Sequence, residues 1–184
     1  MQLEFEIRPP KQWESSKDNN YKNNYFDKII SGFGGDDILF KVIKENGSVK
    51  LLDKNQCVNN SISLAREITL TIQKSNPEDQ LKIFAVLGAS EESLMLMLAS
   101  LHLAAHHCIC FEDLSIEAIV QRIKIFKPDI ILCREKLKEK VKKSISLYSN
   151  ESIKFLVIKT EYTNQVEYSN NSYSYREADT IFTL

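Results

Sequence analysis

Three histidines are the residues of this sequence whose spacing comes closest to a metal site. His102 and His106 lie four positions apart, which on a helix would place both imidazoles on one face, as in helix-borne zinc sites. The residues between them are Leu-Ala-Ala, so the glutamate of an H-E-x-x-H motif is absent. We therefore expect no metal here. We interpret His106 and His107 as helix-end residues, favoured by the negative end of the helix dipole.

Two cysteines share a short apolar run. Cys108 and Cys110 lie two positions apart, so on a strand their side chains would point to the same face. The spacing is not C-x-x-C. With Cys57 and Cys133 they complete a set of four, which we interpret as small buried hydrophobic residues of a protein in a reduced compartment. A metal site or a disulfide is the alternative.

Four carboxylates lie where two predicted helices begin. Glu91 and Glu92 fall in the first turn of one helix, where negative charge suits the helix dipole. Glu112 and Asp113 precede Ser115, a predicted N-cap. We interpret these carboxylates as caps and solvated loop residues rather than as a general acid and general base. The sequence predicts no catalytic residue.

Apart from Cys57 and Cys133, these residues belong to a stretch, residues 81–132, around which the chain is organised. Apolar runs and helical periodicity predict a strand at 83–87, a helix at 90–105, a strand at 107–111, a helix at 115–125 and a strand at 130–133. This alternation is typical of a parallel sheet with crossover helices. Ligands of such sheets bind outside the carboxyl ends of the strands. The candidate loops are therefore 88–91, 111–115 and 133–136.

No phosphate-binding motif follows the first of these strands. Gly88 is a lone glycine, with neither G-x-G-x-x-G nor G-x-x-x-x-G-K-[ST] around it. Glycine readily fills strand-to-helix turns, so we interpret Gly88 as a turn residue. The fold would also allow a small nucleotide-binding protein, but no sequence motif supports that function.

The flanking segments complete an α/β architecture. Asn46-Gly47 between apolar runs at 38–43 and 48–52 predicts a β-hairpin, and Asp53 is suited to cap a helix at 54–73. A lysine-rich helix at 135–148 and a strand at 153–159 follow the central stretch. The predicted fold is a partial doubly wound, mostly parallel sheet with flanking helices. The predicted organisation is an N-terminal arm (1–24), an α/β core (25–160, opening with a short helix at 25–31) and an irregular tail (161–184).

Composition argues against several classes of partner. The 184 residues carry 24 Lys and Arg against 25 Asp and Glu, a net charge of −1, which predicts no general attraction to nucleic acid. No apolar run approaches the roughly 20 residues of a membrane span. The first residues lack the basic and apolar regions of a signal peptide. We expect a soluble cytoplasmic protein with no membrane partner.

The central stretch resembles AMP-forming acetyl/propionyl-CoA synthetases, members of the AMP-binding, adenylate-forming ligases. That family carries a segment of the form P-E-x-x-x-x-M-L-A-x-x-x-x-G-A-x-H-x-x-x-F-x-G-x-S-x-x-x-L-x-x-R-I, followed by a proline and a strand. The positions that match without a gap are Met97-Leu98-Ala99, Ala105, His107, Phe111, Ser115 and Arg122-Ile123, with Pro128 before the next strand. The resemblance covers about residues 25–159 and implies the first N-terminal subdomain of such a ligase.

The sequence departs from that family where flexibility and phosphate contacts are needed. The family glycine before A-x-H is Ala104, and the glycine-rich F-G-G-x-S segment contains Glu112 and Asp113. Basic residues that contact the CoA phosphates in the family leave one match, Lys142, within a run of lysines that otherwise suggests a solvated helix face. The resemblance thus implies Lys142 as a CoA-phosphate contact.

The parental reaction uses ATP, Mg²⁺ and CoA, and it depends on a Thr/Ser/Gly-rich phosphate loop. This chain has no glycine after Gly88, and such loops need glycines so that backbone N–H groups can approach the oxygens. We therefore expect no cofactor for this chain alone. The resemblance implies a truncated or degenerate fragment of an acyl-CoA synthetase-like ligase that supplies scaffold and is inactive alone, which leaves its status as an enzyme open.

The alternative is a stand-alone α/β interaction module or a subunit of a split synthetase. Its partner would be the remainder of the synthetase or a second copy of the chain, because half of a broken domain leaves a sheet edge and an apolar face uncovered.

Overall fold

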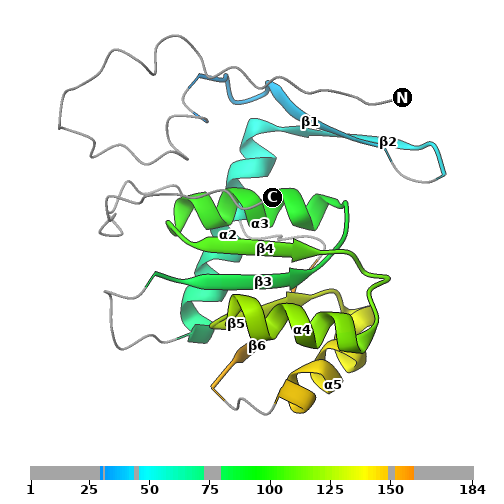
Figure 1. Ribbon diagram of the computed structural model, residues 1–184. Coiled ribbons are helices and arrows are strands. Elements are labelled where there is room, and N and C mark those ends of the chain that lie inside the picture. The colour runs from blue at the N-terminus through cyan, green and yellow to red at the C-terminus, as the bar shows by residue number, and fades with distance from the viewer. Residues whose placement is uncertain (1–29, 31, 44–45, 73–79, 149–151, 160–184) are drawn as a thin grey trace, which may run out of the picture.

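The computed structural model describes residues 30, 32–43, 46–72, 80–148 and 152–159 (Figure 1). Its elements in chain order are β1 (Ile38–Ile43), β2 (Val49–Asp53), α2 (Lys54–Ile72), β3 (Lys82–Val86), α3 (Glu91–His102), β4 (His106–Cys110), α4 (Ile116–Phe126), β5 (Ile130–Cys133), the 3₁₀ turn η2 (Glu135–Leu137), α5 (Lys138–Tyr148) and β6 (Lys154–Val157). The predicted arm and tail lie outside the described residues, as does the short helix at 25–31 apart from Ile30.

Four parallel strands form the central sheet, in the order β4-β3-β5-β6. Helices α2 and α3 cover one face, and α4 and α5 cover the other (Figure 1). The chain passes from β3 to β4 on one side and then crosses back to β5 on the other, so the strand order reverses between β3 and β5. The predicted doubly wound α/β fold is confirmed, and this reversal is the topological switch point of the sheet.

Strands β3 and β5 are buried on both faces because a helix layer covers each side. Ile83 and Ile130 are register partners and pack towards α2 and α3. Phe84 and Ile131 are the next pair and pack towards α4 and α5. Each of these four side chains is 0% exposed. Burying a side chain of this size stabilises the fold by about 1.5–3 kcal/mol. Because both faces of these strands are buried, their sequences are continuous apolar runs.

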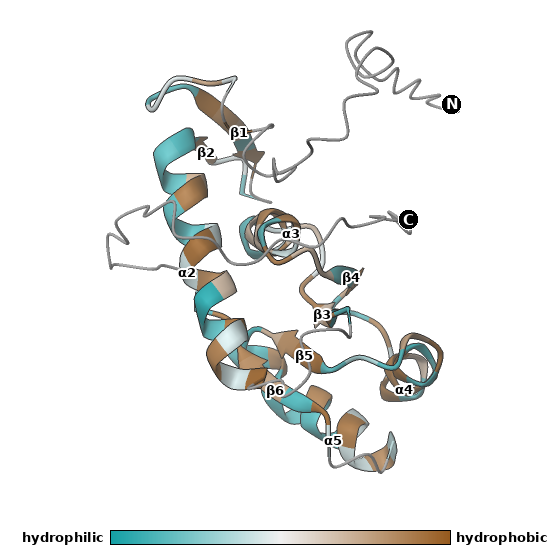
Figure 2. Ribbon diagram, turned by 90° about the vertical axis from the view of Figure 1, so that its left-hand side faces the viewer, coloured by the Kyte–Doolittle hydropathy of each residue, from teal (hydrophilic) through white to brown (hydrophobic). Residues whose placement is uncertain are grey.

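The hairpin β1–β2 is a separate two-stranded sheet that lies beyond α2 and α3 (Figure 1). Gly47 has φ 78°, as the predicted Asn-Gly turn requires. Leu52 on its inner face packs with Cys57 and Leu98 in a third cluster. The outer face exposes mainly apolar side chains, with Lys41 opposite Leu51, and Figure 2 shows how hydrophobic β1 is. The large exposed side chains of the hairpin are Ile38, Ile43, Val49 and Leu51.

Helix α3 ends three residues earlier than predicted, which corrects the interpretation of the histidines. Ala104 has φ 49°, in the left-handed region, and the Ala105 N–H donates to the Ser100 carbonyl at 2.9 Å. The chain then turns directly into β4, whose first two residues are His106 and His107. Their predicted helix-end role is wrong, and His102 and His106 share no helix face.

The predicted helix starts are confirmed. The Asp53 carboxylate accepts from the Gln56 N–H at 2.7 Å at the start of α2. The Ser115 hydroxyl accepts from the Ala118 N–H at 3.2 Å at the start of α4. Among the helices that the structure describes, none has both the length and the apolar character to cross a bilayer.

Candidate functional site

The carboxyl ends of β3, β4 and β5 send their loops to one edge of the sheet, as predicted. The Leu87 and Gly88 N–H groups both donate to the Cys110 carbonyl at 3.1 Å, which joins the loop after β3 to the end of β4. Gly88 has φ 64°, and a Cβ there would lie 3.5 Å from the Glu112 side chain. Gly88 is therefore the turn residue that the sequence predicted, required by its left-handed backbone.

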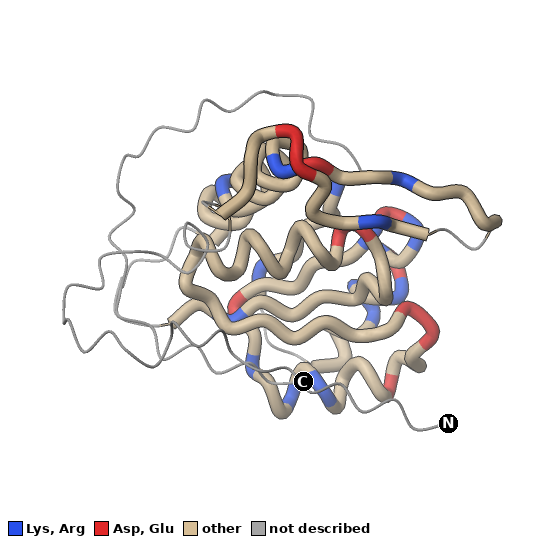
Figure 3. The backbone as a smooth tube through the Cα atoms, turned by 90° about the horizontal axis from the view of Figure 1, so that it is seen from above, with Lys and Arg blue, Asp and Glu red and all other residues tan. Residues whose placement is uncertain are grey.

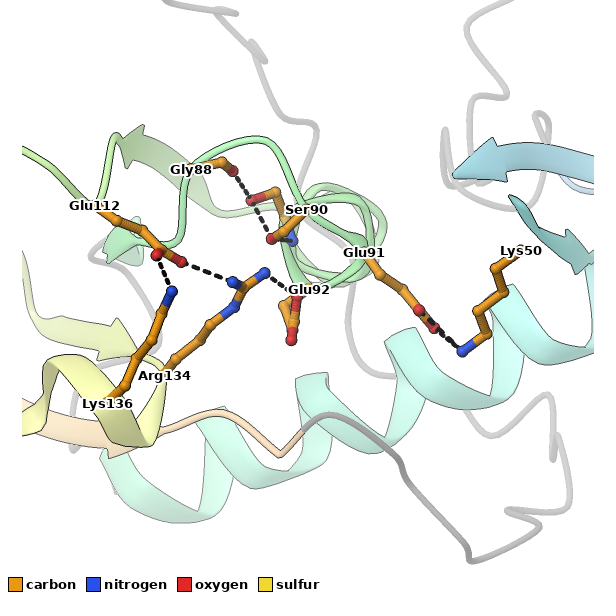
Figure 4. Close-up of polar contacts among 9 residues, drawn as sticks. Lys50, Gly88, Ser90, Glu91, Glu92, Glu112, Arg134 and Lys136 are labelled. Carbon is orange, nitrogen blue, oxygen red and sulfur yellow. Dashed lines mark hydrogen bonds and ion pairs between the residues drawn. The ribbon is translucent and has the colours of Figure 1, made fainter. Parts of the chain in front are cut away.

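Arg134, the residue after β5, lies at the centre of this edge. Its Nη2 donates to Glu92 Oε2 at 2.7 Å, and its Nη1 lies 2.8 Å from Glu112 Oε1. The other oxygen of Glu112 pairs with the Lys136 ammonium. We call Glu92, Glu112, Arg134 and Lys136 the switch-point network (Figure 4). Figure 3 shows acidic and basic residues gathered at this end of the sheet.

Glu92 is the most deeply buried member of the network. It is 5% exposed. Burial by itself raises the pKa of its carboxyl, but the hydrogen bond and the positive charge of Arg134 outweigh burial and hold that pKa below its ordinary value. The Glu112 side chain is 19% exposed. Glu92 lies in the first turn of α3, as predicted. The expectation that Glu92 and Glu112 are solvated is wrong, because both side chains are enclosed counter-ions of Arg134.

The N-terminus of α3 and the hairpin are tied to the same edge. The Ser90 hydroxyl caps α3 by accepting from the Ser93 N–H at 3.3 Å, and the Ser93 hydroxyl donates to the Gly88 carbonyl. Glu91 points the other way and pairs with Lys50 of β2 at 2.8 Å. The two glutamates of the first turn thus serve different ends of the molecule: one holds the hairpin and the other holds Arg134.

The charges of the switch-point network balance. Its two carboxylates face two cations, and the Lys140 ammonium of α5 donates to the Glu112 carbonyl at 2.8 Å. A general acid needs a carboxyl whose pKa is raised towards neutrality, whereas the pKa of Glu92 is lowered. Within the described ranges no three His, Cys, Asp or Glu side chains converge as metal ligands. The arrangement binds three loops together and presents no uncompensated cation of the network.

Lys142, the residue that the resemblance implies as a CoA-phosphate contact, is exposed on α5. It lies two residues beyond Lys140, about 200° around the helix, so the two lysines occupy different sides of α5. Its role stays a prediction. Arg134 is the residue that sequence reasoning missed. The available signal was its place directly after a buried strand, inside a loop already singled out.

Solved structures with a similar fold include an acyl-CoA synthetase, MatB and a benzoate CoA ligase. An acyl-CoA synthetase from Brucella canis matches 77% of this chain with a TM-score of 0.58 and 12% identity. MatB from Rhodopseudomonas palustris and a benzoate CoA ligase from Burkholderia xenovorans each match 73% of it with a TM-score of 0.56, at 12% and 11% identity. No family model and no curated protein matches the chain.

The matched region is a minor part of each ligase. The chain spans about 25% of the length of the acyl-CoA synthetase and of MatB. At these identities the likeness establishes the fold, which is that of the N-terminal subdomain of adenylate-forming ligases. The α/β architecture implied by the resemblance is confirmed.

Proposed function

We propose that these residues supply the N-terminal α/β scaffold of an adenylate-forming ligase fold and carry out no ligase reaction by themselves. The observation that carries this proposal is the switch-point network. Open parallel sheets bind ligands beside the carboxyl ends of their strands at the switch point. Here that position holds two carboxylates of the protein itself, each already paired with the cations that a phosphate group would use.

Charge accounting supports a scaffold rather than a phosphate site. A phosphate arriving at Arg134 would have to replace the Glu92 and Glu112 carboxylates. Displacing them leaves buried negative charge without a partner, which is strongly unfavourable. The sequence also lacks the glycine-rich loop on which ATP binding in the family depends. ATP, Mg²⁺ and CoA are therefore cofactors of the parental reaction and not of this chain alone.

The direct test is an assay of the purified chain with acetate or propionate, ATP, Mg²⁺ and CoA. We expect no AMP and no thioester above the rate without protein, while an intact acyl-CoA synthetase in the same assay forms both. AMP formation that depends on the carboxylate substrate and rises with the concentration of the chain would contradict the proposal.

A second function is favoured by the outer face of the hairpin. Ile43, Val49 and Leu51 are 67%, 51% and 52% exposed, and apolar side chains gathered on one face suit association. The occupant we propose is a polypeptide carrying the rest of the ligase fold, because the chain spans only about 25% of its structural neighbours. In this reading the chain is an interaction module or one subunit of a split synthetase.

An autonomous module and an unstable remnant differ in solution. For a module we expect a monodisperse monomer in size-exclusion chromatography and a single cooperative melting transition. Heterogeneous self-association without a cooperative transition would contradict the module and favour the remnant.

A further inference from the structure

The outer surface of α4 and α5 exposes two large apolar side chains that the scaffold proposal leaves unexplained. Ile125 of α4 is 82% exposed, and Leu147 of α5 is 58% exposed. Ile119 and Ile123 are fully buried, so they mark the face of α4 that packs on the sheet. Ile125 lies two residues beyond Ile123, about 200° around the helix, and therefore points away from the sheet.

The two apolar side chains lie at the same end of one helix layer. Helices α4 and α5 pack side by side on one face of the sheet (Figure 1). Each helix leaves the carboxyl end of one parallel strand and returns to the amino end of another, so their last turns lie at the same edge of the sheet. Ile125 and Leu147 belong to these last turns.

The face of α5 that carries Leu147 is turned towards α4. The Lys140 ammonium donates to the Glu112 carbonyl at 2.8 Å, in the loop that leads into α4. Leu147 follows Lys140 by seven residues, about two helical turns, and so shares that face of α5. Ile125 and Leu147 are therefore parts of one continuous outer surface.

Lysine side chains surround the two apolar residues. Lys124 and Lys127 flank Ile125 along the chain, and Lys143 lies one turn before Leu147 on the same face of α5. All three lysines are exposed. We call this surface the α4–α5 corner; it consists of Lys124, Ile125, Lys127, Lys143 and Leu147.

The carboxylates of the two helices lie at the other end. Glu117 is in the first turn of α4, and Glu139 is in the first turn of α5. Within the described ranges, no carboxylate forms an ion pair with a lysine of the α4–α5 corner. The net charge of −1 averages over this separation of charge, so it is compatible with a local basic surface.

We propose that the α4–α5 corner binds the surface of a lipid bilayer that contains anionic headgroups. The lysine ammonium groups pair with the negative charges of the headgroups. Ile125 and Leu147 enter the boundary between the headgroups and the acyl chains, where their apolar surface leaves water. Binding of this kind is peripheral and reversible, and it requires no membrane-spanning segment.

The apolar side chains favour a bilayer over other polyanions. Exposed lysines on a helix are usually a solvated face, and a nucleic acid could also pair with them. The phosphates of a nucleic acid would leave Ile125 and Leu147 in water, whereas the bilayer interface accommodates both kinds of side chain. The hairpin lies on the other side of the sheet, beyond α2 and α3, and stays accessible to a polypeptide partner.

The test is flotation of the full chain with vesicles made of equal parts of phosphatidylserine and phosphatidylcholine, compared with phosphatidylcholine alone. We expect binding to the anionic vesicles only, and weaker binding as salt screens the lysines. Lys124→Gln and Lys127→Gln should each lower the affinity about fivefold. Ile125→Ser should lower it about tenfold. Ile43→Ser is the matched control, because Ile43 is 67% exposed on the hairpin, and it should leave the affinity unchanged.

A measurement on the unsubstituted chain guards against variants that misfold. Anionic vesicles should protect Lys124, Lys127 and Lys143 from acetylation, read residue by residue by mass spectrometry, while the exposed Lys41 of the hairpin stays reactive. Circular dichroism checks that each variant is folded. Absence of binding to anionic vesicles would overturn the proposal, as would an equal loss of affinity in Ile43→Ser. Unchanged vesicle binding in Ile125→Ser, with equally tight binding of a DNA duplex, would identify a general polyanion surface instead.

Discussion

Replacing Arg134 by methionine is expected to lower the free energy of unfolding by about 2–4 kcal/mol at about pH 7.5. Methionine keeps much of the volume and removes the charge, so Glu92 is left ionised at 5% exposure and Glu112 keeps only Lys136. Breaking a fully buried pair costs about 3–5 kcal/mol, and the loss is smaller here because the Arg134 side chain is 28% exposed.

The pH dependence of this loss has a definite sign. In the native chain the pKa of Glu92 is lowered on folding, so its contribution is present above its unfolded pKa and is lost as pH falls through the folded pKa. In Arg134→Met the effect of the cation is gone, and burial is opposed only by the hydrogen bonds of the carboxylate to its own backbone and to Ser90, so the pKa of Glu92 is higher than in the native chain. The variant therefore gains stability relative to the native chain as pH falls and Glu92 takes up a proton. The difference between the two proteins should shrink towards about pH 4.5.

Urea unfolding at both pH values measures the effect. Arg122→Met makes the same chemical change at an exposed position of α4 and should stay within about 0.5 kcal/mol of the native chain at about pH 7.5. Adding Glu92→Gln to Arg134→Met should recover part of the loss, because the buried group is then neutral. An Arg134→Met penalty no larger than that of Arg122→Met would show that the network contributes little to stability.

Replacing Glu112 by glutamine is expected to raise the affinity for pyrophosphate at least about tenfold, or 1.4 kcal/mol. The side chain keeps its shape, but Lys136 loses its only carboxylate partner among the contacts of the switch-point network, and Arg134 keeps Glu92 alone. The charge of the network changes from zero to +1. A multivalent anion then gains charge-assisted hydrogen bonds without having to displace Glu112.

Isothermal titration with pyrophosphate at low ionic strength measures this gain, which should fall as salt screens the new charge. Glu135→Gln is the matched control: it removes one negative charge at the same edge, from a side chain 71% exposed that pairs with Lys138. Equal gains in both variants would indicate a general effect of net charge. No gain in Glu112→Gln would contradict the view that this carboxylate closes the site.

The strands and loops of the core were predictable because their signals are local. Apolar runs marked β3 and β5, and the loops after the three strands were expected at one edge because parallel strands share their direction. The pairing of Glu92 with Arg134 was not predictable, since 42 residues separate them and no local spacing encodes a tertiary ion pair. Glutamates in the first turn of a helix are ordinarily explained by the helix dipole. That explanation gave no reason to expect a buried ion pair at Glu92.

The end of α3 was mispredicted for a different reason. A residue in the left-handed region is usually glycine, but here it is Ala104. Alanine has the highest helix propensity of all amino acids. Helical periodicity therefore carried the predicted helix through to residue 105. The resemblance had placed a family glycine at this position, and the backbone now explains why: the turn needs a left-handed residue whichever side chain occupies it.

The order of the charged residues along the chain also affects when the protein can fold during translation. Both carboxylates of the switch-point network precede both of its cations, and β5 must pair with β3 before β6 can be added to the sheet. At about 5–20 residues per second, a ribosome needs roughly 2–8 s to travel from Glu92 to Arg134, 42 residues later. During that interval the nascent chain carries first Glu92 and then also Glu112, and their guanidinium partner has yet to be made. Stable folding during translation must therefore wait until Arg134 has left the exit tunnel.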